Sequence, residues 1–176
     1  MIAAVGYAEL TPDMLTVVEA DLRAALERLP EGMSGLVRAG AGVPVAFGRA
    51  VRAAGRELIV VAPTQGMVPA LLPRRDRMAV GELLALAQQV RLLEFDPGDR
   101  DACVGADERL ILGCRQALAV WDGSPSNGRD ATAHLVAYAR ARGIPLTVVP
   151  PPDGRDRSTT VGAQPIRTTD EAATPR

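Results

Sequence analysis

Short apolar runs alternate along this chain with longer segments that have the periodicity of amphipathic helices, and this alternation constrains the fold more than any other feature. The apolar runs cover residues 2–6, 35–39, 57–62, 90–95, 117–121 and 145–149. Strands that alternate with helices pair as parallel strands, and they are nearly continuously apolar because helices cover both faces of the sheet. The pattern predicts a three-layer α/β fold with a parallel sheet in the middle.

The segments between the runs predict the helices. The first begins at Thr11, Pro12 and Asp13, where a hydroxyl caps the helix, proline takes its first position and an acid follows in the first turn. Further helices are expected over residues 44–54, 80–89, 99–113 and about 131–143. The crossover before residues 90–95 is the longest, and such a length is typical of a flap over a cleft. The apolar helix over 80–89 packs either against its own core or against a second subunit.

Length and composition limit the class of protein. With 176 residues and 47% hydrophobic content, we expect a single domain over residues 1–149. Residues 150–176 are rich in Pro, Asp, Arg, Ser and Thr, which predicts a disordered tail. A net charge of −1 and 3% aromatic residues argue against nucleic-acid binding. No apolar run is long enough for a membrane span and no signal peptide is evident, so a cytoplasmic protein without membrane contact is expected.

The cysteines and the histidine give little support for metal or redox chemistry. Cys103 and Cys114 are expected in one helix, about 16 Å apart at 1.5 Å per residue, which is too far for a disulfide. We interpret them as small buried side chains. His134 is the only histidine, and it has no partners at metal-ligand spacing. We therefore expect neither a metal ion nor a cofactor.

A ligand of an open parallel sheet binds at the carboxyl ends of the strands, so the residues just after each strand are the candidate site. They are Gly6-Tyr7-Ala8, the glycine turn over 39–42, Pro63-Thr64-Gln65 and the loop over 121–132. Glycines there allow close approach of backbone to a phosphate, although ordinary tight turns remain the alternative. The predicted ligand-binding residues are Gly6, Tyr7, Gly40, Gly42, Thr64, Trp121, Asp122, Gly123, Asn127, Gly128, Arg129 and Thr132.

The loop over 121–132 carries the most specific signal. It joins an apolar strand to an amphipathic helix, whose first N–H groups are suited to bind an anion. Trp121 offers a flat apolar face and Asp122 an acceptor for ribose hydroxyls. Arg129 could pair with a phosphate, whereas Asp130 could cap the helix and compete with that phosphate for the same N–H groups. The loop therefore favours a small nucleotide-type ligand over a purely structural turn.

These segments resemble those of the SLOG superfamily, a Rossmann-like group that includes the Lonely Guy enzymes. The strongest element is the block over 117–140, with its apolar strand, Trp-Asp-Gly turn and Val-Ala-Tyr-Ala-Arg helix; weaker elements are Gly6 with the helix start over 10–12, and the glycine turn over 40–42. The resemblance implies a Rossmann-like sheet over most of the chain. Arg129-Asp130-Ala131-Thr132 stands where the family has Gly-Gly-Thr, which adds bulk and negative charge at the phosphate position.

The resemblance also bears on catalysis. Lonely Guy enzymes carry a glutamate two residues after the motif threonine and an arginine on the preceding helix. Here His134 takes the glutamate's position, and Arg109 is a loose candidate for the arginine. We therefore assign no catalytic residue and favour a non-catalytic nucleotide-binding or sensing module. The alternatives are a degenerate scaffold that binds a protein partner or a second copy of itself, and a phosphoribohydrolase-like enzyme, in which His134 would act as a general acid or base.

Overall fold

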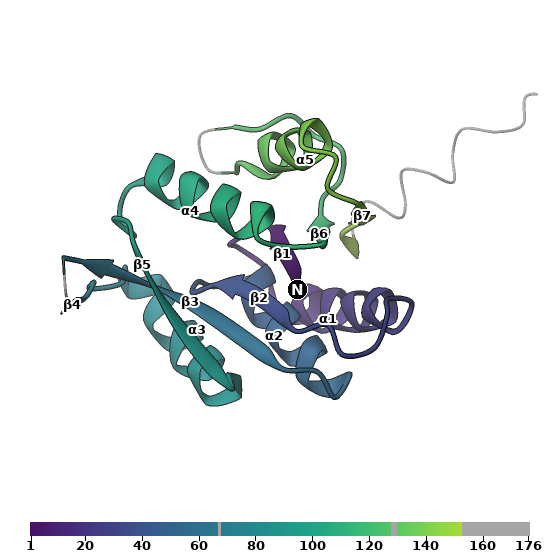
Figure 1. Cartoon of the computed structure of the whole chain (residues 1–176), viewed down its shortest axis with the longest axis horizontal. Helices are drawn as coiled ribbons and strands as arrows, with labels where there is room; N and C mark the ends of the chain where they lie inside the picture. Colours follow the sequence, from purple (N-terminus) through teal and green to yellow (C-terminus); the bar gives the residue numbers. More distant parts are fainter. Residues whose placement is uncertain (67, 128–129, 153–176) are drawn as a thin grey trace, which may run out of the picture.

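A computed structural model describes residues 1–66, 68–127 and 130–152 of the chain. Within them, a seven-stranded sheet has helices on both faces (Figure 1). The elements are, in chain order, β1 (Ile2–Gly6), α1 (Pro12–Glu27), β2 (Gly35–Arg38), α2 (Val43–Ala53), β3 (Leu58–Gln65), β4 (Val68–Pro69), α3 (Arg74–Leu86), β5 (Gln89–Glu94), α4 (Arg100–Leu112), β6 (Gln116–Val120), α5 (Thr132–Ala141) and β7 (Leu146–Val149). The predicted tail lies, from residue 153 onward, outside the described residues.

The sheet has a single reversal in its strand order. The strands lie in the order β5-β3-β2-β1-β6-β7, and each neighbouring pair is parallel. The two-residue strand β4 is the exception, because it pairs antiparallel with the end of β3. The chain builds outward from β1 to β5, then returns to place β6 on the other side of β1. The carboxyl ends of β1 and β6 therefore form the switch point at which such sheets bind ligands.

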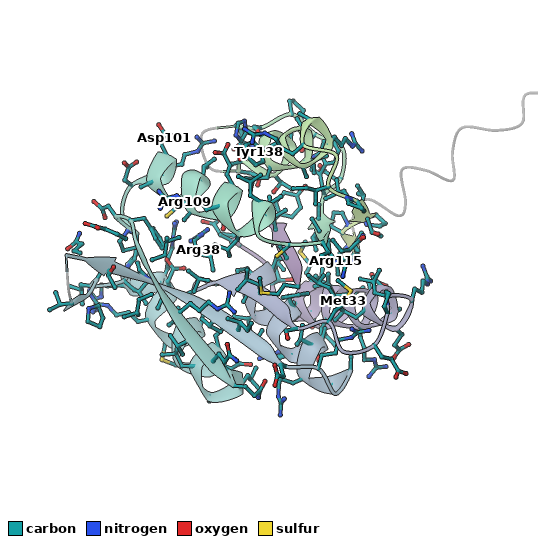
Figure 2. All side chains as sticks on the ribbon, viewed as in Figure 1. Met33, Arg38, Asp101, Arg109, Arg115 and Tyr138 are labelled. Atoms are coloured by element: carbon teal, nitrogen blue, oxygen red, sulfur yellow. The ribbon has the colours of Figure 1, made fainter. Side chains whose placement is uncertain are left out.

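One face of the sheet is covered by α4 and α5 (Figure 1). Its core is apolar, with Leu36 and Ile59 of the sheet packed in the same cluster as Ile111 of α4 and Val136 of α5. Arg38, at the end of β2, is the charged exception: its side chain lies between the sheet and α4 (Figure 2). A charged side chain inside a covered layer needs a partner there. For Arg38 this partner is Asp107 of α4.

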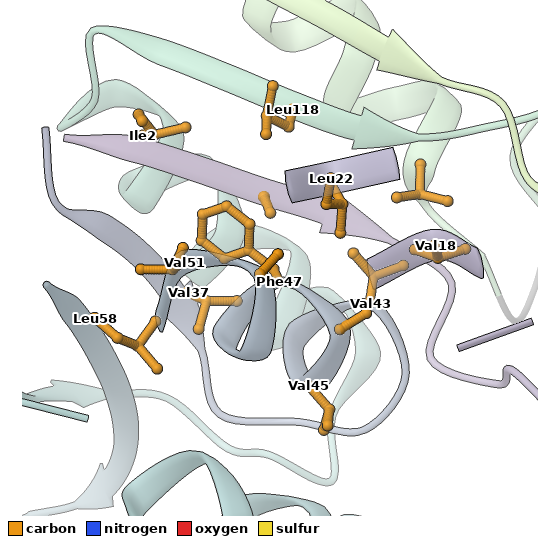
Figure 3. Close-up of a cluster of buried hydrophobic side chains, with 14 of the residues drawn as sticks. Ile2, Val18, Leu22, Val37, Val43, Val45, Phe47, Val51, Leu58 and Leu118 are labelled. Carbon is orange, nitrogen blue, oxygen red and sulfur yellow. The ribbon is translucent and has the colours of Figure 1, made fainter. Parts of the chain in front are cut away.

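The opposite face is covered by α1, α2 and α3. Phe47 of α2 is fully buried among Val37 of β2, Val51 of its own helix and Leu22 of α1 (Figure 3). The alternation of neighbouring β2 residues between this cluster and the other one is the period-two pattern of a strand buried on both sides. The predicted three-layer, Rossmann-like α/β fold is thereby confirmed.

Arg56 holds the end of α1 against the start of β3. Its side chain is 8% exposed, and its guanidinium donates to the carbonyl oxygens of Leu26 (2.9 Å), Leu29 (2.8 Å), Pro30 (2.8 Å) and Met33 (3.2 Å). The last carbonyl groups of a helix have no partner within it and carry partial negative charge, so a cation is the fitting donor.

The third crossover differs from the sequence-based prediction. The helix expected over 80–89 is α3, which begins at Arg74 and ends at Leu86. Its start follows Pro73 and is rich in charged residues, so apolar periodicity alone did not reveal it. Its end is set by the sheet, because the backbone N–H of Leu58 donates to the side chain of Gln88 and the backbone N–H of Gln88 to the carbonyl of Leu58, which leads the chain into β5.

Two smaller expectations were also wrong. Pro63, Thr64 and Gln65 belong to β3 rather than to a loop after it, because β5 and β4 both pair with this stretch. Cys114 lies beyond the end of α4, after the Gly113 cap, and is not in the same helix as Cys103. Both cysteines are free.

Gly42 gives a direct test of how the loops are packed. It has a φ of +73°, and a Cβ there would lie 2.3 Å from the carbonyl oxygen of Tyr7. Gly55 has a φ of +68° but open space around it. We expect Gly55→Ala to cost about 1–2 kcal/mol of the free energy of unfolding through backbone strain alone, and Gly42→Ala to cost about 1–3 kcal/mol more through the clash. Urea denaturation measures both; equal losses would contradict the packing described.

Candidate functional site

A cavity of about 750 Å³ opens at the carboxyl edge of the sheet, at the switch point beside β1 and β6. It lies between the loops that follow β1, β2, β5 and β6, with the start of α3 and one side of α4 completing the wall. Its lining residues within the described ranges include Gly6, Tyr7, Glu9, Arg38, Gly40, Arg75, Asp76, Arg100, Cys103, Asp107, Asn127, Asp130 and Thr132.

The structure brings several of the predicted site residues together at this cavity. Gly6, Tyr7, Gly40, Asn127 and Thr132 all line it, although they come from the ends of three separate strands and the segments that follow them. The common location follows from the parallel sheet, because the carboxyl ends of parallel strands meet at one edge.

The other predicted residues lie elsewhere. Gly42 lines a neighbouring cavity of about 530 Å³ beside α1 and α2. Thr64 is buried within β3. Trp121, Asp122 and Gly123 are not among the lining residues of either cavity, and Gly128 and Arg129 fall outside the described residues.

The turn after β6 is held by hydrogen bonds among its own residues. The indole N–H of Trp121 donates to the carbonyl of Ser124 (2.7 Å), and the N–H of Ser124 donates to Asp122 Oδ1 (2.9 Å). Hydrogen bonds from the side chain and the backbone N–H of Ser124 lower the pKa of Asp122. The N–H of Asp122 donates to the hydroxyl of Tyr7 (3.2 Å), which ties this turn to the loop after β1. Trp121 packs against the cluster under α4 and α5 rather than facing the cavity.

Asp130 lies just before α5, the helix whose start the sequence predicts to bind an anion. Its Oδ1 accepts from the N–H (3.1 Å) and the hydroxyl (2.6 Å) of Thr132, the first residue of α5. Ser126 Oγ accepts from the N–H of His134, in the same first turn (2.9 Å). The first turn of α5 thus already binds a carboxylate from the chain itself. Asp130 therefore accepts from the first turn of α5, although the N-cap residue of this helix is Ala131, which makes no side-chain hydrogen bond to it.

At the glycine turn after β2, Asp76 accepts a backbone N–H in the same way that Asp130 does at α5. Its Oδ1 accepts from the N–H of Ala41 (3.2 Å), between the two turn glycines. Asp76 belongs to the first turn of α3 and is 9% exposed. Carboxylates of the chain therefore occupy both loops that the sequence analysis assigned to phosphate.

The cavity wall carries charged side chains of both signs. Arg38 makes a two-bond ion pair with Asp107 of α4, with Nε and Nη2 at 2.8 and 3.1 Å from the two carboxylate oxygens. Burial lowers the pKa of Arg38, but the charge and hydrogen bonds of Asp107 outweigh it and raise the pKa above its ordinary value. Arg100 donates to the carbonyl of Asn127 (3.0 Å) and so joins α4 to the loop after β6. The arginines at the wall are therefore largely engaged.

Cys103 lines the cavity but is not an activated nucleophile. Burial raises the pKa of its thiol, and the nearby charge of Arg38 only partly opposes that rise. Reactive cysteines have a lowered pKa, because the thiolate is the nucleophile.

His134 is not among the lining residues of the cavity. Its Nε2 lies 2.6 Å from Oε1 of Glu108, so the contact joins α5 to α4 at the surface. Arg109, the other residue considered for catalysis, is also outside the lining. Among the described residues, no group of three or more His, Cys, Asp or Glu side chains is arranged to hold a metal ion.

Sequence reasoning missed Arg38, Asp76 and Asp107 as site residues. Arg38 carried a usable signal, because a charged residue that ends a buried strand needs a partner nearby. Asp107 lies one helical turn after Cys103, a spacing that places both on one side of α4. Nothing local marked Asp76, which reaches the glycine turn from α3.

Comparison with known proteins agrees with this architecture. No protein-family model and no curated protein matches the chain. Among solved structures, DNA processing protein A (DprA) from Streptococcus pneumoniae is similar, with a TM-score of 0.54 and 16% identity over 93% of this chain and 56% of that chain. The protein TM1055 has a TM-score of 0.49 and 14% identity over 82% of this chain and 71% of that chain.

The chain thus has a Rossmann-like fold of the kind that its resemblance to the SLOG superfamily implies, and it shares that fold with DprA. It spans 56% of the DprA chain to which it is similar. Within the described ranges, no helix has the length and apolarity that a membrane crossing requires.

The Arg38–Asp107 pair allows a test of the site's electrostatics. Asp107→Asn keeps the side-chain shape but leaves the Arg38 charge without its counter-ion, so we expect a loss of about 1.5–3 kcal/mol in the free energy of unfolding. Glu82→Gln is the matched control, because Glu82 pairs with Arg49 at a more exposed position and should cost below about 1 kcal/mol. Urea denaturation at neutral pH compares the two variants. Losses of the same size would show that the Arg38 pair is not desolvated.

Proposed function

We propose that the chain is a non-catalytic binding module for a nucleotide derivative, which it holds in the cavity at the carboxyl edge of its sheet. The cavity itself is the observation that carries this proposal. Its volume of about 750 Å³ falls within the roughly 300–1,000 Å³ typical of small-molecule sites. Its place at the switch point is where open α/β sheets bind ligands.

The composition of the wall supports a polar ligand of this class. Three arginines and four carboxylate residues line the cavity among the described residues, together with Tyr7 and several small residues. Such a wall suits a molecule with several hydrogen-bonding groups and one flat apolar part, which is the make-up of a nucleoside unit.

The raised pKa of Cys103 and the position of His134 outside the described lining support binding without chemistry. The Cys103 thiol has a raised pKa. His134 and Glu108 pair with each other outside the described cavity lining. Nucleophilic or acid–base catalysis needs an activated group within reach of the ligand.

Nucleic-acid binding is not part of the proposal. DNA processing protein A shares the fold, but at 16% identity a shared fold does not transfer function. A net charge of −1 offers no excess of cations for a polyanion.

A partner-binding scaffold is the second candidate, and the edge strand β5 favours it. Val90 and Leu92 on this strand are 49% and 62% exposed, and an unpaired strand edge with apolar side chains is a template for pairing with another chain. A second copy of the chain is the occupant to test, through β5 of each copy. Light scattering across a concentration series distinguishes the candidates: a dimer that Leu92→Glu dissociates supports the scaffold, and a monomer removes this support.

The binding module predicts ligand-induced stabilisation. In thermal melting against a panel of nucleosides, nucleotides and dinucleotides, we expect at least one class to raise the melting temperature, because a ligand at 100 times its Kd adds about 2.7 kcal/mol to the native state. The same panel run on Gly40→Phe, which places a ring in the cavity, should show no shift.

Gly40→Ala is the matched control for this experiment. A Cβ at Gly40 meets only ordinary contacts, with Arg38 Nη1 at 3.7 Å and Pro44 Cγ at 3.8 Å, so the alanine variant should fold and respond as the natural chain does. A shift that persists in Gly40→Phe would place the ligand elsewhere, and no shift in any chain would remove the binding module.

A further inference from the structure

The guanidinium of Arg38 has a second edge that its ion pair leaves unused. Nε and Nη2 lie 2.8 and 3.1 Å from the two carboxylate oxygens of Asp107. Nη1 has no hydrogen-bond partner among the described residues, yet it is not one of their fully buried unpaired atoms, so it keeps exposed surface. It lies 3.7 Å from the position that a Cβ on Gly40 would take, and both residues line the cavity. Arg38 thus presents accessible N–H groups at the cavity.

Asp107 fixes the direction of this second edge. A planar guanidinium that is held at two nitrogens cannot turn on its own, so the pair also determines where Nη1 lies. The N–H bonds that remain on Nη1 and Nη2 form the end of the fork, which suits two adjacent acceptors. Asp107 already balances the charge of Arg38, and four carboxylate residues face three arginines in the described wall. A neutral pair of acceptors therefore fits this edge better than a further anion.

Asp76 supplies an acceptor at the same glycine turn. Its Oδ1 accepts from the N–H of Ala41 (3.2 Å), which holds the carboxylate against the turn. Its Oδ2 has no hydrogen-bond partner among the described residues and also keeps exposed surface. Nε of Arg75 lies 3.6 Å from Oδ2, beyond hydrogen-bond length, on a side chain that is 66% exposed and can turn to solvent. Asp76 thus presents an accessible, positioned acceptor in the cavity wall.

The donor edge of Arg38 and the acceptor of Asp76 are neighbours that do not pair with each other. The ion pairs within the described ranges join Arg38 to Asp107 and Asp76 to Arg75. Burial lowers the pKa of Arg38, and the charges of Asp107 and, more weakly, of Asp76 raise it, so Asp76 lies within electrostatic range of the guanidinium. Groups of opposite polarity at this spacing can both contact a flat ligand that carries acceptors on one edge and donors on the next.

Guanine is the common base that has this pattern. Its N7 and O6 are adjacent acceptors, to which arginine binds with two hydrogen bonds. Its N1–H and 2-amino groups, next to O6, are donors that suit a carboxylate. Adenine has a 6-amino donor beside N7, which would meet the N–H groups of Arg38. Cytosine has only one donor group beside its acceptors, and the acceptors of uracil flank a donor.

We infer that the cavity selects a guanine base, with N7 and O6 bound to the second edge of Arg38 and the N1–H and 2-amino groups bound to Asp76. This inference rests on the proposed function, since it names the base of the ligand in the same cavity. Arg38 and Asp76 are then the residues that determine specificity, and Asp107 is a positioning residue that acts through Arg38.

Isothermal titration calorimetry with the four common ribonucleosides and their four monophosphates tests the inference on the full chain. We expect the guanine member of each series that binds to do so at least about tenfold more tightly than the other three, which is the discrimination typical of a two-bond arginine–guanine contact. Two analogues separate the two contacts. 7-Deazaguanosine lacks the N7 acceptor and inosine lacks the 2-amino donor, and each should bind about tenfold more weakly than guanosine.

Two variants assign these losses to residues. Arg38→Lys keeps a cation beside Asp107 but has no second edge, so it should bind guanosine and 7-deazaguanosine equally. Asp76→Asn keeps an acceptor for Ala41 and places an amide N–H₂ donor against the donors of the base, so it should bind guanosine and inosine equally. Asp13→Asn is the control and should bind as the natural chain does, since Asp13 is also an acid in the first turn of a helix, α1, but lines neither cavity.

Melting curves show whether each variant is folded before titration, and the two analogues decide the question on the natural chain if Arg38→Lys does not fold. Tighter binding of another base would overturn the inference and leave the proposed function standing. Analogues that bind as well as guanosine, or losses that persist in the folded variants, would have the same effect. Failure of both ligand series to bind would overturn the inference together with the proposed function.

Discussion

The backbone N–H groups at the carboxyl edge of the sheet need acceptors, and the way this chain supplies them determines the character of its site. Asp130 serves the start of α5, and Asp76 serves the glycine turn after β2. Each contact also has a structural effect, because Asp76 ties α3 to the turn after β2 and Asp130 orders the entry into α5. In a fold whose glycine turns and helix starts favour anions, the chain provides those anions itself.

Much of the architecture could be predicted from the sequence because strand and helix periodicities are local signals. The run over 2–6 became β1 with the same bounds, and the capping residues Thr11 and Pro12 marked the start of α1. The start of α3 could not be read this way, because its first turn is charged and only its second half shows an apolar pattern. Arg56 was equally hidden, since its carbonyl partners are 23 to 30 residues away in sequence.

The candidate site was predictable in location but not in chemistry. Strand-end logic gave the loops that carry Gly6, Gly40 and Thr132, because the carboxyl ends of parallel strands must meet at one edge. The direction of a side chain is not set by that logic: Trp121 turns to the core, and Asp107 enters from a helix. DprA shares the Rossmann-like fold at 16% identity, but the residues that line a site, and not the fold, decide what binds there.

A titration followed by two-dimensional ¹⁵N–¹H NMR tests the central claim, that a nucleoside-type ligand occupies the cavity at the switch point, most directly. With adenosine, guanosine, cytidine and uridine added in turn, we expect one of them to shift the amide signals of Tyr7, Ala41 and Thr132, which line the cavity. Signals from the edge strand β5 should stay unchanged. Shifts confined to β5, or no shifts with any of the four, would show that no nucleoside binds in this cavity.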